Sequence, residues 1–197
     1  MPSDLKLVAI HGSPRRNGHS SRLLAAAIHG ARTAGACVEE LFPDTLRLAP
    51  CREDYGCAID GHCLIDDDFR QIANQLEHCH GLMVASPVFF GTVPAPLKLL
   101  IDRCQCFWVR KYRLHDTALR QRPALVIVTA ARRKSPQLFE GVLRPLRYFC
   151  DALNMSVQDS CCYDALEELD DLDKDPRRLE EAFAAGVHLA QTAGRNA

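Results

Sequence analysis

A loop near the N-terminus contains the residues best suited to bind an anion. It spans residues 11–21, between a short apolar run and an Ala- and Leu-rich stretch. Backbone N–H groups, hydroxyls and the N-terminus of a following helix together form a site for phosphate. We expect Gly12 and Gly18 to supply backbone conformations that other residues resist, and Ser20 or Ser21 to cap the helix. The loop is therefore predicted to hold a phosphate.

The sequence excludes two common kinds of phosphate loop. It lacks the Gly-Lys-Ser/Thr ending of nucleoside-triphosphate loops and the three-glycine pattern of dinucleotide folds. A terminal monophosphate, held mainly by neutral donors, fits better. The alternative is an ordinary strand-to-helix connection, but such connections usually span only about 2–6 residues. This loop is longer and richer in donors, which favours binding.

A second candidate loop, residues 86–98, contains three prolines and the pair Phe89 and Phe90. Ligands of parallel α/β sheets bind at the carboxyl ends of the strands, next to the first strand. We therefore expect this loop to lie beside the phosphate loop. Its amides and aromatic rings suit a flat heteroaromatic ring, and we expect one of the two phenylalanines to belong to the core.

Three of the ten cysteines, Cys51, Cys57 and Cys63, lie close together in the chain. In a reducing compartment such cysteines are better explained by metal, cluster or redox chemistry, or by burial, than by disulfides. A zinc site of three thiolates with Asp54 or His62 is one interpretation. A loop whose thiols bind nothing is another. Burial or exposure explains Cys104 and Cys106 better than ligation, although either could lend a ligand if the loop folds over their helix.

The elements that must position these loops follow from the hydrophobic pattern. Strands are predicted at 5–10, 37–42, 81–86, 123–129 and 155–162, and helices at 20–34, 68–79, 95–107, 138–153 and 176–192. The runs 81–86 and 123–129 are apolar throughout, as in strands covered on both faces. Five alternations predict an α/β fold, a doubly wound parallel sheet with helices on both faces, in a single domain over residues 1–197.

Two further segments have simpler interpretations. The three aspartates at 66–68 favour the start of the second helix over a metal site. The basic and aromatic segment 107–122 is predicted to be a long loop, a candidate lid, nicotinamide contact or subunit contact.

Bulk composition limits the class of protein. The formal net charge is −1 over 197 residues, which argues against nucleic acid as the main partner. No apolar run is long enough to cross a bilayer. The chain enters a strand soon after Met1, so we expect no signal peptide and a cytoplasmic location.

Taken together, segments 12–20, 66–67, 86–92 and 97–103 resemble the NADPH-dependent FMN reductases and the iron–sulfur flavoproteins of the flavodoxin-like group. Order and spacing agree over residues 5 to 160 or so. The resemblance implies a flavodoxin-like five-stranded sheet that binds FMN. It implies a phosphate held around Gly18 by Ser13, Arg15, Asn17, His19 and Ser20. It places the isoalloxazine ring against Pro87, Val88, Phe89, Phe90 and Gly91.

The chain departs from this family in the loop after the fourth strand, residues 129–135. The family's loop is usually glycine-rich and touches the flavin, whereas this one is basic. We expect Ala131 and Arg132 to contact the cofactor. The basic residues suit the anionic edge of a reduced ring or the phosphate of a nicotinamide cofactor; a solvated surface loop is the alternative. His19, where the family often has Asn, can still donate to phosphate.

Residues 50–63, which contain Cys51, Cys57 and Cys63 and are called the cysteine segment, also depart from the family pattern. The iron–sulfur flavoproteins carry a compact four-cysteine motif here that binds one cubane cluster. Cys51, Cys57 and Cys63 match it, but Asp54 occupies the second ligand position. A carboxylate is a harder and weaker ligand than a thiolate. The resemblance therefore implies a [4Fe-4S] cluster that is labile at one iron.

The function implied by the resemblance is that of an NAD(P)H-dependent FMN oxidoreductase. NAD(P)H would give a hydride to FMN N5, and one or two electrons would pass to a quinone, flavin or protein acceptor, with the cluster relaying single electrons. A flavin-binding electron carrier or redox sensor without its own substrate is the alternative; a descendant that has lost the flavin is another. By resemblance we expect a homodimer or homotetramer.

Overall fold

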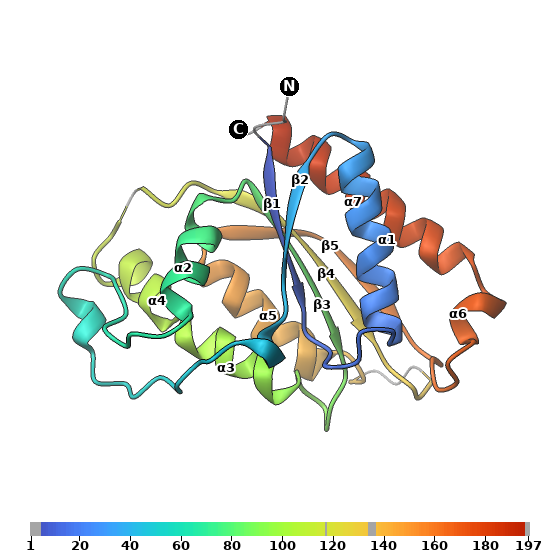
Figure 1. The fold of residues 1–197 in the computed structure, drawn as a ribbon, viewed down its shortest axis with the longest axis horizontal. Coiled ribbons are helices and arrows are strands. Elements are labelled where there is room, and N and C mark those ends of the chain that lie inside the picture. The colour runs from blue at the N-terminus through green and yellow to red at the C-terminus, as the bar shows by residue number, and fades with distance from the viewer. Residues whose placement is uncertain (1–4, 117, 134–136, 196–197) are drawn as a thin grey trace.

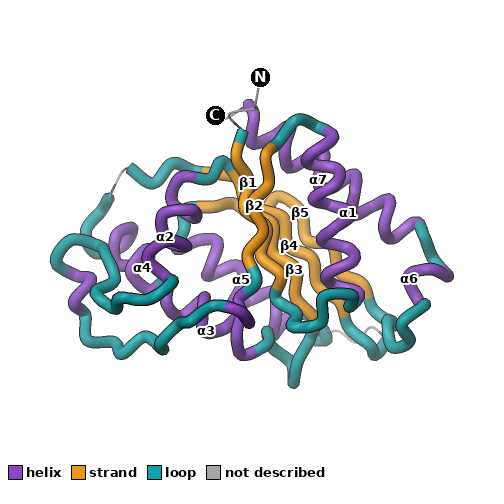
Figure 2. The backbone as a smooth tube through the Cα atoms, viewed as in Figure 1, coloured by secondary structure: helices purple, strands orange, loops and turns teal. Residues whose placement is uncertain are grey.

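Five parallel strands form the centre of the molecule, in the order β2-β1-β3-β4-β5 (Figures 1 and 2). The computed structural model describes residues 5–116, 118–133 and 137–195. The strands are β1 (Lys6–His11), β2 (Cys37–Leu41), β3 (Gly81–Pro87), β4 (Arg122–Thr129) and β5 (Met155–Tyr163). This is the flavodoxin-like strand order, so the predicted fold class is confirmed.

Helices cover both faces of the sheet (Figure 1). One face carries α1 (His19–Thr33) and α7 (Arg177–Arg195). The other carries α2 (Phe69–His78), α3 (Ala95–Arg103), α4 (Gln105–Tyr112) and α5 (Glu140–Ala152). The connections contain the short helix α6 (Asp171–Lys174) and two 3-10 turns, η1 (Pro43–Thr45) and η2 (Gly56–Ala58).

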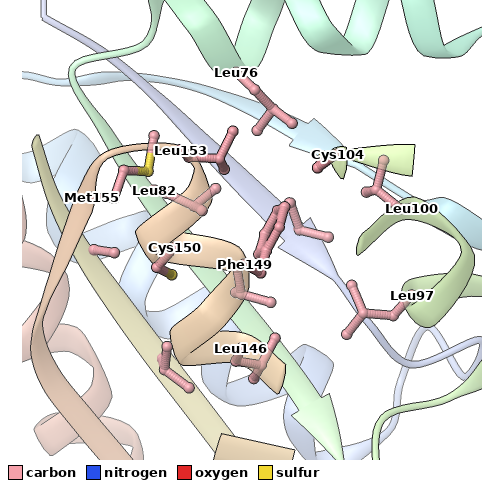
Figure 3. Packing of buried hydrophobic residues seen from close by; sticks show 14 of the residues in the cluster. Leu76, Leu82, Leu97, Leu100, Cys104, Leu146, Phe149, Cys150, Leu153 and Met155 are labelled. Carbon is pink, nitrogen blue, oxygen red and sulfur yellow. The ribbon is translucent and has the colours of Figure 1, made fainter. Parts of the chain in front are cut away.

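The alternation of side chains along the strands creates two cores. Along β1, Leu7 and Ala9 pack towards α1 and α7, and Val8 and Ile10 pack towards α2–α5. Figure 3 shows the second core, where residues of α2, α3 and α5 meet the sheet. Every residue of β4 is buried, as its apolar run predicted.

The helices α1 and α7 touch through their backbones. A Cβ added at Gly30 would lie 2.1 Å from the carbonyl oxygen of Phe183, and one added at Gly186 would lie 1.9 Å from that of Ala27. Both positions therefore require glycine for close approach. Since α1 begins at the phosphate loop, this contact fixes one wall of the candidate site.

The predictions of a single helix over 95–107 and of a loop over 107–122 are wrong. Helix 95–107 divides at Cys104 into α3 and α4, and α4 extends into the segment predicted as a loop over 107–122. Phe107 and Val109 are buried in the core, which explains why the chain turns and continues as helix. The basic residues among them made the segment resemble a solvated loop.

Over the described residues, the helices are all too short or too polar to traverse a lipid bilayer.

Candidate functional site

The two predicted loops meet at the carboxyl edge of the sheet. His11 ends β1 opposite Ala85 of β3, and the Gly12 amide donates to the Ala85 carbonyl at 2.7 Å. A Cβ at Gly12 would lie 2.6 Å from that oxygen and 2.6 Å from Leu97 Cδ2. Gly12 is thus required by close packing.

The predicted reason for the two glycines is wrong. Gly18 has an ordinary φ of −72°, and Gly12 is outside the left-handed region. Glycine at these positions serves tight packing, because a Cβ at Gly18 would also lie 3.2 Å from the Arg15 carbonyl oxygen.

The phosphate loop folds around the backbone of Arg15. Ser13 Oγ accepts from the Arg15 amide at 3.1 Å, and Ser21 Oγ donates to the Arg15 carbonyl at 2.9 Å. Helix α1 begins at His19 after Gly18, and among the described residues no side chain caps it. The prediction that Ser20 or Ser21 caps the helix is wrong, because both lie inside its first turn. The first N–H groups of α1 are therefore left for a ligand.

His19 carries the clearest sign of a missing partner. Both ring nitrogens are buried, and neither has a hydrogen-bond partner among the described residues. A buried polar group left unpaired costs about 1–3 kcal/mol, so a bound group explains it best. Ser13 and Ser20 are buried beside it, whereas Arg15 and Asn17 are exposed. The phosphate of FMN fits this donor set.

The second predicted loop, residues 86–98 (the ring loop), contains a tight turn at residues 89–92. Phe89 and Thr92 exchange backbone hydrogen bonds of 2.9 and 3.0 Å. Between them, Phe90 and Gly91 have φ values of 49° and 77°. Phe89 is 42% exposed and Phe90 fully exposed. The expectation that one phenylalanine belongs to the core is wrong, because the turn lifts both rings away from the sheet.

A cleft opens between the ring loop and the loop after β4. Its volume is about 480 Å³, within the range of small-molecule sites, about 300–1,000 Å³. The Val88 amide donates to the Thr129 carbonyl at 2.9 Å, which joins the two loops. Pro87 and Phe89 lie outside the lining, and Lys134 and Ser135 lie outside the described residues. The lining consists of Val88, Phe90, Gly91, Ala130, Ala131, Arg132, Gln137 and Leu138.

Gly141 supports this cleft and was missed by the sequence analysis. It lies in the first turn of α5, and a Cβ there would lie 1.7 Å from the Gly91 carbonyl oxygen. The only signal was a glycine inside a predicted helix, where alanine is normally favoured.

Gly141→Ala is expected to weaken FMN binding about tenfold or more, a loss of about 1.4 kcal/mol, because the new methyl group displaces the ring loop. Titration of the apoprotein by flavin fluorescence checks this. Gly194→Ala is the matched control, since its Cβ would make only an ordinary 3.7 Å contact with Leu5. Unchanged affinity in Gly141→Ala would contradict the assignment.

The cysteine segment folds against α4 and encloses a small pocket. In the described part of the chain, no three His, Cys, Asp or Glu side chains already form a metal-holding group. Asp54 Oδ1 accepts from the Gly56 amide at 3.2 Å, which closes a local turn. The pocket lining includes Cys51, Asp54, Cys57, Cys63, Arg103 and Cys106.

The thiols of this pocket lie close enough to influence one another's pKa. Burial, together with the nearby Cys63 and Cys57, raises the pKa of Cys106 to about 12. Burial also raises the pKa of Cys57. Both thiols are therefore protonated at neutral pH in the free protein.

Arg103 joins this pocket to the start of α2. It is 1% exposed, and it donates to Asp67 from Nη2 at 3.0 Å and to Cys63 Sγ at 3.3 Å. Asp67 Oδ1 also accepts from the Phe69 amide at 3.0 Å, so one of the three aspartates bonds to the helix start as predicted. Asp68 instead accepts from the Arg47 amide at 2.8 Å. Arg103 lies in the segment 97–103 that resembles the family, but the sequence alone indicated no role for it.

Comparison with known families matches most of the chain. The model for "NADPH-dependent FMN reductase" matches residues 5–161. An iron–sulfur flavoprotein of Methanosarcina thermophila is 34% identical over 99 residues, 50% of this chain and 52% of that protein. The chain spans about half the length of the curated relatives it matches.

Solved structures show the same fold. A flavone reductase superposes with a TM-score of 0.71 at 16% identity, over 96% of this chain and 63% of the other. An NAD(P)H:quinone oxidoreductase from Methanothermobacter marburgensis superposes with a TM-score of 0.68 at 19% identity, over 95% and 100%. At such identities the likeness establishes the fold alone.

Proposed function

The chain belongs to the NADPH-dependent FMN reductase family, and on this premise we propose that it transfers electrons from NAD(P)H through bound FMN to an acceptor. The acceptor class is a quinone, a flavin or a protein. With a quinone, NAD(P)H loses two electrons and a proton, a second proton comes from solvent, and the quinone becomes a hydroquinone.

One observation carries the proposal: His19 has two buried, unpartnered ring nitrogens at the uncapped start of α1. Ser13, His19 and Ser20, with the first amides of α1, would hold the phosphate. Val88, Phe90 and Gly91 would hold the ring, with Ala131 across the cleft, and Phe89 would support the turn that carries them. When bound, FMN supplies the hydride-accepting chemistry, so the protein needs no nucleophile or general acid.

A positively charged side chain lines the cleft and suits the phosphate of the electron donor NADPH. Arg132 lines it and is exposed. A guanidinium there can pair with the phosphate of NADPH or with the anionic edge of a reduced ring.

We also propose that the cysteine segment holds a cubane cluster that relays single electrons. The relatives named iron–sulfur flavoproteins support this, as do the three thiols Cys51, Cys57 and Cys63 around one pocket. The sequence pattern puts Asp54 at the second ligand position of the motif, which would complete the set of four. We further propose that the chain forms a homodimer or homotetramer. Phe90 is fully exposed at the rim of the cleft, and aromatic side chains are enriched at subunit interfaces.

Anaerobic purification followed by FMN loading and an NADPH oxidation assay with a quinone tests the function. We expect stoichiometric FMN uptake and steady NADPH oxidation that depends on FMN. FMN uptake without any nicotinamide reaction would support the electron carrier instead. Protein that takes up no FMN at saturating concentration would overturn the proposal.

A further inference from the structure

We propose that the fourth ligand of the cluster is Cys106 on α4, and that Asp54 is not a ligand. The inference rests on the cluster part of the proposed function. The motif spacing suggests Asp54 as the remaining ligand, whereas the fold places Cys106 in the same pocket as the three thiols. The site would then have four thiolates, Cys51, Cys57, Cys63 and Cys106.

The fold brings the cysteine segment onto α4. Cys106 lines the same pocket as the three thiols of the segment, although it is 43 or more positions further along the chain. A Cβ added at Gly61 would lie 2.3 Å from Arg110 Cγ, so the segment is pressed against this helix. In Figure 1 the segment between η1 and α2 runs beside α4.

The break at Cys104 gives Cys106 its position. Because α4 begins at Gln105, Cys106 lies in the first turn of a new helix. The N-terminal end of a helix favours negative charge and stabilises thiolates. Had α3 continued without a break, residue 106 would lie in a helix interior, away from any helix start.

Arg103 provides an independent sign that a ligand is missing from this pocket. It lines the pocket, and its Nε is buried without a partner among the described residues. Buried N–H groups are nearly always paired, and cluster sulfurs accept hydrogen bonds. Its positive charge would also offset the negative charge of a four-thiolate cluster.

Asp54 has a different task in this structure. Its carboxylate accepts from the Gly56 amide at 3.2 Å and stabilises the turn at η2. Iron–sulfur clusters also select thiolates over harder carboxylates. On cluster binding, each of the four thiols loses its proton to solvent as its sulfur bonds to iron and displaces a weaker ligand. No electron leaves the protein in this exchange.

The test is anaerobic reconstitution of the full chain with an iron salt, sulfide and dithiothreitol. Iron, acid-labile sulfide and the EPR spectrum of the reduced protein are measured. The wild type is expected to hold about four irons and four sulfides per chain. Cys106→Ala should fall to about a tenth of that content or less, since even outer-shell changes cost about 10- to 100-fold in metal affinity. Asp54→Asn should retain the wild-type content and spectrum.

Two further variants separate ligand loss from damage to the fold. Cys104→Ala removes a neighbouring buried thiol outside the pocket lining and should leave the cluster intact. Adding Asp54→Cys to Cys106→Ala gives the segment a fourth thiol and should restore the cluster. FMN content, which depends on a different site, should be unchanged throughout.

The inference fails if Cys106→Ala keeps its cluster while Asp54→Asn loses it. It also fails if Asp54→Cys does not restore the loss, because Cys106 would then serve the fold. A wild type that binds one zinc ion, or no iron, overturns the cluster and the inference together. NADPH oxidation by the FMN-loaded protein would survive that result, so the two failures are distinguishable.

Discussion

Arg103→Met is expected to lower the free energy of unfolding by about 3–5 kcal/mol, the cost of breaking a buried ion pair from one side. Arg103 is 1% exposed, donates to both Asp67 oxygens, and donates to the Ala49 carbonyl at 2.8 Å. Methionine fills the space but leaves Asp67 as an uncompensated charge. Urea unfolding of the apoprotein measures the difference.

A neighbouring exposed pair is the matched control. Arg47 bonds Asp68 at 3.1 Å, and its side chain is 90% exposed. Arg47→Met should therefore cost less than about 1 kcal/mol. An Arg103→Met loss as small as this would contradict a structural role for the buried pair.

The stability lost in Arg103→Met should depend on pH. Burial alone would raise the pKa of Asp67, but hydrogen bonds from Arg103 and two backbone amides lower it overall. A carboxyl whose folded pKa is lowered stabilises the protein above its unfolded pKa. The difference between wild type and variant should thus be full near neutral pH and shrink as pH falls below about 4.

His19→Leu is expected to weaken FMN binding about 10- to 100-fold, because hydrogen bonds to a charged group contribute about 1.5–3 kcal/mol. The same change should stabilise the apoprotein by about 1 kcal/mol, since it removes a buried polar group without a partner. A purely structural histidine would not produce these opposite signs. Flavin fluorescence titration and urea unfolding measure the two effects.

Two controls sharpen the result. His29→Leu changes an exposed histidine of the same helix and should leave FMN affinity unchanged. Riboflavin lacks the phosphate, so its affinity should be equal in wild type and His19→Leu. If riboflavin and FMN lose affinity equally, His19 does not bind phosphate.

The sheet was predictable because its signal is local. The apolar runs 81–86 and 123–129 became β3 and β4, which are almost wholly buried, and the other strands lie within two residues of their predicted ends. The split at Cys104 was not predictable. Phe107 and Val109 become buried only once α4 packs against α3 and α5, and their basic neighbours hid that pattern.

The residues of the candidate site also include some that could be predicted from the sequence and some that could not. Loop positions at strand ends could be predicted, since the topology of a parallel sheet brings them to one edge. Gly141 and Arg103 could not be assigned roles, because each acts through a segment distant in the chain. Cys106 was expected to lend a ligand only if the cysteine segment folds over its helix. Gly141 meets Gly91 and Arg103 meets Asp67. Such contacts leave little mark on local composition.

The backbone contact between α1 and α7 at Gly30 and Gly186 limits which parts of the candidate site can change during evolution. It fixes the position of α1, so in the proposed function the phosphate of FMN would have a fixed anchor. The rim of the cleft includes the small turn at Phe90, whose side chain is fully exposed. If the proposed function holds, substitution of Phe90 would reshape the entrance, and with it the choice of electron acceptor, while the position of α1 stays unchanged.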